Sequence, residues 1–99
     1  MKYFIINIHY TASPERLNEV TPDHRAYLKT KYDEGIMIFS GPRVPRTAGF
    51  LFARAENISI IEDMIINDPF KINKIADYEI IEIAPVLWAP ELNKIFENA

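Results

Sequence analysis

Alternating apolar positions predict four β-strands in this chain. Successive side chains of a strand point to opposite faces of a sheet, so residues two apart share a face. In residues 2–10 one face carries Phe4, Ile6, Ile8 and Tyr10, and we expect this face to pack on helices. Three further short apolar segments are the other predicted strands. They are residues 36–40, 49–54 and 77–83.

Helical patterns appear in two segments between these strands. The first helix is expected to start at Thr21-Pro22, because threonine caps helices and proline suits the first helical position. Gly35 can adopt the left-handed conformation that commonly ends a helix. The second helix is expected to begin at Asn57 or Ser59, either of which can cap its N-terminus.

The order strand, helix, strand, strand, helix, strand predicts an α+β fold of the ferredoxin-like βαββαβ type. Its four-stranded antiparallel sheet carries the helices on one face. We expect one domain over residues 1–99, in which 88–99 form a C-terminal tail or short helix. Residues 11–20 are expected to form a polar connection, in which Ser13-Pro14 can begin a helical turn. The uncovered face of the sheet is also apolar, so we expect a second subunit to cover it in a homodimer.

Charge and missing motifs exclude several classes of protein. The chain has 11 basic and 14 acidic residues and a net charge of −3, without the basic excess of a nucleic-acid groove. No run approaches the ~18 apolar residues of a membrane-spanning helix. There is no cysteine, which is compatible with a reducing cytoplasm, and no glycine-rich phosphate loop or metal-binding motif. We expect a cytoplasmic protein that uses no metal, cofactor, membrane or nucleic acid.

Two polar residues near prolines are candidates for acid–base chemistry. His24 falls on the opening turn of the expected first helix, where the helix dipole disfavours imidazolium and so favours a proton acceptor. Asp68 is held extended by the proline that follows it and could orient an imidazole. Each residue also has a structural interpretation. His24 could be a solvated surface residue, and Asp68 could cap the turn after it.

Three candidates lie on or after the strands. Ser40 and Arg43 both lie at the end of the second strand, separated by Gly41 and Pro42. There a hydroxyl and a guanidinium could hold an anionic or phenolic oxygen. The alternative is an ordinary strand exit with an arginine in solvent. His9, on the first strand, has no second metal ligand in view and is interpreted as structural.

Taken in order, these segments resemble the YciI-like family from Tyr3 to Pro85. The resemblance rests on Pro22-Asp23-His24-Arg25, Glu34-Gly35, the Ser40–Arg46 segment, Gly49, Asp68-Pro69-Phe70 and Ala76-Asp77-Tyr78-Glu79-Ile80. It implies a dimeric ferredoxin-like α+β barrel with a site built on a histidine–aspartate pair. By position the pair is His24 and Asp68, with Ser40 and Arg43 as lining groups that bind substrate.

The resemblance also implies a substrate class. Activities suggested in the family concern small aromatic or phenolic compounds, including dehydrochlorination of a chlorinated hydroquinone. The leading hypothesis is therefore a cofactor-independent isomerase, lyase or dehydrochlorinase that uses His24 as general acid or base. The alternatives are a non-catalytic dimeric protein that binds a small molecule or acts as an accessory protein, and a purely structural hydrogen bond between His24 and Asp68.

Overall fold

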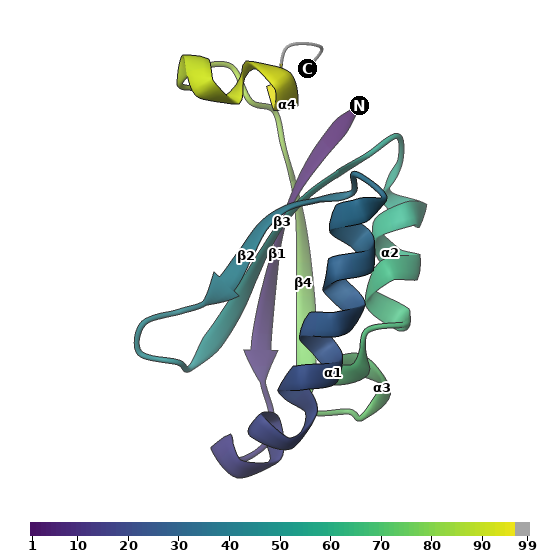
Figure 1. The fold of residues 1–99 in the computed structure, drawn as a ribbon, viewed down its shortest axis with the longest axis vertical. Helices are drawn as coiled ribbons and strands as arrows, with labels where there is room; N and C mark the ends of the chain where they lie inside the picture. Colours follow the sequence, from purple (N-terminus) through teal and green to yellow (C-terminus); the bar gives the residue numbers. More distant parts are fainter. Residues whose placement is uncertain (97–99) are drawn as a thin grey trace.

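The computed structural model describes residues 1–96 and holds a four-stranded antiparallel sheet with helices packed on it (Figure 1). The strands are β1 (Lys2–Tyr10), β2 (Met37–Pro42), β3 (Ala48–Ala55) and β4 (Ala76–Ile83). The helices are α1 (Pro14–Asp33), α2 (Ile58–Ile66), α3 (Pro69–Ile72), the 3-10 helix η1 (Pro90–Leu92) and α4 (Asn93–Phe96). The strand order is β2-β3-β1-β4. The predicted ferredoxin-like fold is confirmed.

The face of β1 that was predicted to meet the helices does so. Phe4 and Ile6 have no exposed surface, and Ile8 is buried beside them. They belong to one core cluster with Leu28 of α1 and Ile61 of α2. Figure 1 shows α1 and α2 side by side against the sheet. The predicted register of β1 is therefore correct, because a shift by one residue would exchange its two faces.

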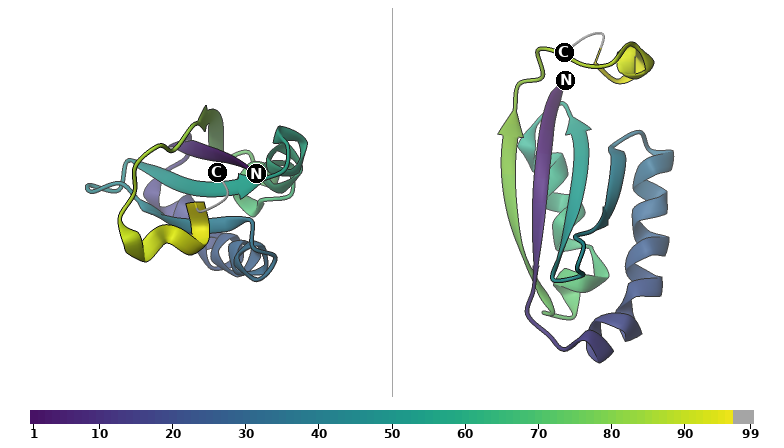
Figure 2. Two further views of the ribbon diagram at one scale, coloured as in Figure 1. Left: turned by 90° about the horizontal axis from the view of Figure 1, so that it is seen from above. Right: turned by 90° about the vertical axis from the view of Figure 1, so that its left-hand side faces the viewer.

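The opposite face of the sheet is partly covered by the C-terminal segment. Tyr3, Phe52 and Phe96 form a second buried cluster, and the Tyr3 hydroxyl donates a hydrogen bond to the backbone carbonyl of Ile95. Figure 2 shows the short helices η1 and α4 at one end of the molecule, next to the N-terminus. The short helix expected within 88–99 is present as a 3-10 turn followed by α4, and residues 97–99 lie outside the described residues.

The first helix begins earlier than predicted. It starts at Pro14, where the Ser13 side chain accepts a backbone N–H as N-cap, and it continues through Pro22. Most of residues 11–20 is thus helical, and the predicted start at Thr21 is wrong. A stripe of buried side chains at helical spacing crosses the proline, and its burial offsets the hydrogen bond that proline removes. The stripe consists of Leu17, Val20, His24 and Leu28.

The end of the second helix brings a carboxylate toward the first. Asn57 caps α2, which resolves the two predicted alternatives, because its side chain accepts the backbone N–H of Ile60. After α2 the helical conformation breaks off, and Asp68 becomes the N-cap of α3 just before Pro69. Since α3 packs against α1, this break places Asp68 against the inner side of α1.

Candidate active site

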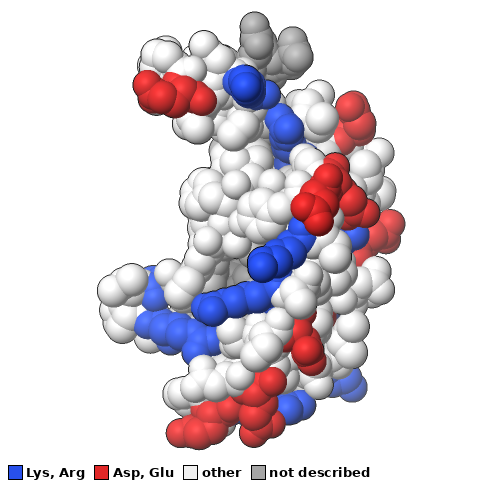
Figure 3. Space-filling model, in the orientation of Figure 1, with Lys and Arg blue, Asp and Glu red and all other residues white. Residues whose placement is uncertain are grey.

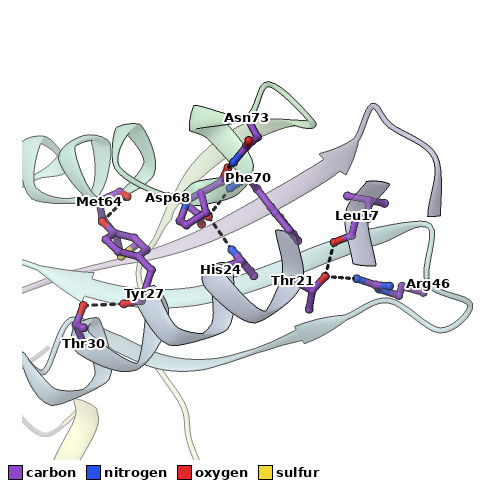
Figure 4. Close-up of polar contacts among 11 residues, drawn as sticks. Leu17, Thr21, His24, Tyr27, Thr30, Arg46, Met64, Asp68, Phe70 and Asn73 are labelled. Carbon is purple, nitrogen blue, oxygen red and sulfur yellow. Dashed lines mark hydrogen bonds and ion pairs between the residues drawn. The ribbon is translucent and has the colours of Figure 1, made fainter. Parts of the chain in front are cut away.

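His24 and Asp68 meet at the junction of α1 and α3. The imidazole Nδ1 lies 2.7 Å from Oδ1 of Asp68 (Figure 4). Both residues are buried, Asp68 with 1% and His24 with 8% of its surface exposed. The contact expected from the sequence is present, but the reason given for His24 as a proton acceptor is wrong. His24 lies in the middle of α1, so the helix-dipole argument does not apply to it.

Asp68 is held in place by the start of α3. Its Oδ1 accepts the backbone N–H of Phe70 at 3.0 Å, as an N-cap residue does. The same oxygen faces the imidazole of His24. The capping and orienting interpretations of Asp68 are therefore compatible, since one oxygen makes both contacts.

This arrangement determines which imidazole nitrogen is free. A carboxylate only accepts hydrogen bonds, so Nδ1 of His24 carries the proton that it donates to Asp68. In the neutral imidazole the other nitrogen, Nε2, then has a free lone pair. Among the described residues, Nε2 makes no hydrogen bond, and His24 lines the cavity described below. A molecule in that cavity would meet a proton acceptor.

The plane of the imidazole is set by an aromatic neighbour. The ring of Phe70 stacks on that of His24 with centroids 3.9 Å apart and an interplanar angle of 1°. Phe70 is itself buried and packs edge-on against Tyr10 of β1. Because Asp68 fixes one edge of the imidazole and Phe70 one face, the orientation of Nε2 is fixed before any ligand binds.

A cavity of about 360 Å³ opens beside His24, between α1 and the β2–β3 hairpin. This volume lies at the lower end of the usual range for small-molecule sites. Its walls are mostly apolar and aromatic, with hydroxyl and cationic groups among them. The lining residues are Ile8, Tyr10, Thr21, His24, Arg25, Leu28, Lys29, Tyr32, Ser40, Gly41, Pro42, Arg46, Gly49, Phe50, Leu51 and Phe70. The space suits one small ring.

Of the two predicted lining residues, one reaches this cavity and one does not. Ser40 lines it and shares a 2.7 Å hydrogen bond with the hydroxyl of Tyr32. Arg43 instead lines a separate hollow with Asn7 and His9, so its expected place beside His24 is wrong. The reason is strand alternation: residues three apart along an extended segment point to opposite faces of the sheet.

Arg46 occupies the position that was expected for Arg43. It lines the cavity, and its guanidinium donates hydrogen bonds to the Asn18 side chain and, at 2.8 Å, to the Thr21 hydroxyl. It also lies over the ring of Tyr10, 5.8 Å from the centroid. The sequence showed Arg43 and Arg46 as one basic pair. The turn between β2 and β3 brings Arg46, and not Arg43, back to the helix side of the sheet.

Tyr78 is a second residue that sequence reasoning missed. It pairs with Ile8 across β1 and β4, so it lies on the helix side of the sheet. Burial, and then the charge of Asp68, raise the pKa of Tyr78 well above its ordinary value. Among the described residues, neither the Tyr78 hydroxyl nor Oδ2 of Asp68 has a hydrogen-bond partner. Both atoms are buried, and the effect of Asp68 on the Tyr78 pKa shows that the two side chains lie close together.

The raised pKa of Tyr78 predicts that the protein loses stability in alkali. Above the ordinary tyrosine value of 10.0 the unfolded chain releases a proton that folded Tyr78 keeps. The stability present below about pH 10 should then fall with rising pH, by up to about 1.4 kcal/mol per pH unit for this group. Tyr78→Phe should flatten the fall, measured by urea unfolding at successive pH values.

Part of the alkaline slope should remain in that variant. Burial, with smaller effects of Asp68 and Glu34, raises the pKa of Tyr27 to about 12, and its hydroxyl donates to the Met64 carbonyl at 2.7 Å. Tyr32, exposed on the same helix, supplies the matched control as Tyr32→Phe. An equal alkaline slope in the wild type and the Tyr78 variant would contradict the prediction.

Two other features bear on the class of site. His9 is exposed on the uncovered face of the sheet, away from the cavity of His24. Residues 1–96 contain no group of three histidine, cysteine or acidic side chains placed to hold a metal ion. Nor does a helix in this part of the chain have the length and apolar character to span a bilayer.

The geometry described above defines a ferredoxin-like α+β domain with a cavity between its first helix and a hairpin. Residues 1–84 match the model of the YCII-related domain. The chain therefore belongs to the YCII-related family, as the resemblance in its sequence predicted. A search of curated proteins gave no match.

Two solved structures illustrate the shared fold. One is the 5-chloro-2-hydroxyhydroquinone dehydrochlorinase of Burkholderia phenoliruptrix AC1100 in complex with 2,5-dihydroxybenzoquinone. Its TM-score is 0.62 at 19% identity, covering 78% of this chain and 90% of that one. The other is an antibiotic biosynthesis monooxygenase, with a TM-score of 0.60 at 13% identity, covering 88% of this chain and 100% of that one. At these identities the likeness concerns the fold.

Proposed function

We propose that this protein is an enzyme in which His24 acts as general base and acid on a small phenolic, aromatic or enolisable molecule. The observation that carries the proposal is the buried 2.7 Å contact between Nδ1 of His24 and Asp68, made beside a cavity. It leaves Nε2 as the proton acceptor. A base held by an orienting carboxylate is a recurring catalytic arrangement.

The chemistry follows from this pair. Nε2 takes a proton from a phenolic hydroxyl or an acidic C–H, and Asp68 stabilises the imidazolium that forms. The electron pair left behind moves into the ring or enolate. Return of the proton to another atom gives an isomerisation. Departure of a neighbouring leaving group such as chloride, with its electrons, gives an elimination. Neither route transfers electrons to a carrier, so we propose that no cofactor takes part.

Support for the substrate class comes from the cavity and from one structural neighbour. The cavity has room for a small ring between apolar walls, and Ser40 and Tyr32 supply hydroxyls on one side. The neighbour is a dehydrochlorinase of a phenolic compound, with a small quinone bound. The alternative function is binding of a similar molecule without turnover, which the same cavity would allow.

An activity assay separates these functions. The protein is incubated with 5-chloro-2-hydroxyhydroquinone, and chloride release is followed together with the ultraviolet spectrum. A set of phenols and enolisable acids in D₂O, followed by NMR, detects proton exchange without a leaving group. Turnover or exchange above the uncatalysed rate supports the enzyme. Binding of these compounds with neither signal supports the non-catalytic alternative.

We also propose that residues 1–99 act as one cytoplasmic domain that pairs with a second copy. The support is the apolar part of the sheet face that the C-terminal segment leaves open. Phe39 is 54% exposed there, stacked on Phe50, and Ile81 is 40% exposed. A sheet face of this character is usually covered.

The dimer has a direct test. We expect light scattering at micromolar concentration to give twice the 11.5 kDa chain mass. The interface between the two copies should bury more than ~1,200 Å² in total. Phe39→Glu should shift the mass toward the monomer, because an unpaired charge is costly to bury. Ile66→Glu is the matched control, since Ile66 is exposed on α2, away from the sheet. A monomeric wild type would contradict the proposal.

A further inference from the structure

The charge of the cavity beside His24 is opposite to that of the whole protein. Arg25 and Lys29, one turn apart on α1, line it together with Arg46 from the β2–β3 turn. Among the described residues, no aspartate or glutamate lines it, although the chain has a net charge of −3. Figure 3 shows lysine and arginine side chains gathered across the hollowed part of this face.

These three cations are not neutralised within the described part of the chain. The close contacts between basic and acidic side chains there are the ion pairs Arg16–Glu19 and Lys31–Glu34 and the hydrogen bond His24–Asp68. None includes Arg25, Lys29 or Arg46. Like charges one helical turn apart repel each other, as Arg25 and Lys29 do. An anion between these cations would remove that repulsion.

The side chain of Arg46 is already held in one orientation before such an anion binds. Its two terminal nitrogens donate to Asn18 and Thr21 of α1, and its guanidinium lies over Tyr10. A guanidinium has five N–H donors, so donors remain after these contacts. A side chain already held in one orientation loses little conformational freedom when a carboxylate or phenolate binds.

We propose that the molecule bound at this site is an anion, a small ring or enol whose carboxylate or ionised hydroxyl lies among Arg25, Lys29 and Arg46. The apolar wall of Leu28 and Phe70 takes the ring, and the acidic hydrogen faces Nε2 of His24. This inference rests on the proposed function for the role of His24. The binding of an anion can nevertheless be tested without turnover.

The test is calorimetric titration with matched charged and neutral probes. One pair is 4-hydroxybenzoate and 4-hydroxybenzamide, which differ in a carboxylate. The other is 4-nitrophenolate and 4-nitroanisole, which differ in an ionised hydroxyl. We expect the charged member of at least one pair to bind about tenfold more tightly or better. The pair that shows the difference identifies the anionic group.

Variants assign the preference to the three cations. Arg46→Gln should weaken binding of the preferred anion about tenfold and leave its neutral partner unchanged. Arg25→Gln and Lys29→Gln should act in the same direction. Lys94→Gln, an exposed lysine on α4 outside the cavity, is the control that should bind as the wild type does. Raising the salt concentration should reduce the preference.

The outcomes separate this inference from the proposed function. Equal affinity for charged and neutral members of both pairs, or no binding of either anion, overturns the inference and leaves catalysis by His24 standing on its own assay. Tight anion binding without any turnover supports the inference and overturns the proposed enzyme. His24→Asn should retain the preference for the anion, because the imidazole is not one of the three cations.

Discussion

Replacing His24 by asparagine should lower turnover by about 10²–10⁴-fold, the usual contribution of a general base, and leave the fold intact. Asparagine keeps an N–H that can donate to Oδ1 of Asp68, where Nδ1 now lies at 2.7 Å. It has no counterpart of Nε2. The substitution therefore removes the proposed proton acceptor and preserves the buried hydrogen bond that a structural role would require.

Two measurements make this result decisive. Turnover is compared with the melting temperature followed by circular dichroism, so that a loss of activity is not confused with unfolding. His9→Asn is the matched control, because it removes the other histidine of the chain, which is exposed and distant from the cavity. Full activity in the His24 variant, or an equal loss in the His9 variant, would rule out His24 as the base.

The pair of His24 and Asp68 was predicted mainly through the family resemblance. Reasoning from the residues alone left a surface histidine and a capping aspartate as open alternatives. The contact depends on how α3 packs against α1, and local sequence does not specify that packing. Burial of His24 on the stripe with Leu17 and Leu28 was visible only once α1 was known to begin at Pro14.

The misplaced helix start shows how a local signal can mislead. Thr21-Pro22 has the residue types of a helix N-terminus, but Ser13-Pro14 has them too. The second pair caps the helix in the structure. In the interior, Thr21 instead donates its hydroxyl to the Leu17 carbonyl at 2.7 Å and helps to hold Arg46. The polar residues around Pro22 thus serve the cavity and not a helix end.

The lining of the cavity was the least predictable part of the site. Ser40 could be placed because it lies within a strand, where alternation assigns a face. Arg43 directly follows β2, and alternation places it on the face opposite Ser40, whereas Arg46 lies in the turn, where alternation ends. Alternation along residues 77–83 places Tyr78 on the face opposite Ile81, but its position beside Asp68 depends on the register between β1 and β4. These are long-range relations that a single sequence does not reveal.

Substitutions of Asp68 should separate its two contacts, and they carry the largest combined effect expected here. Asparagine is as good an N-cap as aspartate, and its carbonyl oxygen can still accept the N–H of Phe70. Asp68→Asn should therefore change the free energy of unfolding by less than about 1 kcal/mol. Turnover should fall by about 10²–10⁴-fold, because the amide does not stabilise an imidazolium and can favour the wrong tautomer of His24.

Asp68→Ala should lose stability as well as activity. It removes the cap of α3, worth about 0.5–2 kcal/mol, and leaves the buried N–H of His24 without a partner, at a further cost of about 1–3 kcal/mol. Asn57→Ala removes the cap of α2 alone and should lose only about 1 kcal/mol with full turnover. Urea unfolding and turnover are measured for all three variants. If both Asp68 variants retain full activity, the carboxylate serves only as the cap of α3 and the imidazole works without it.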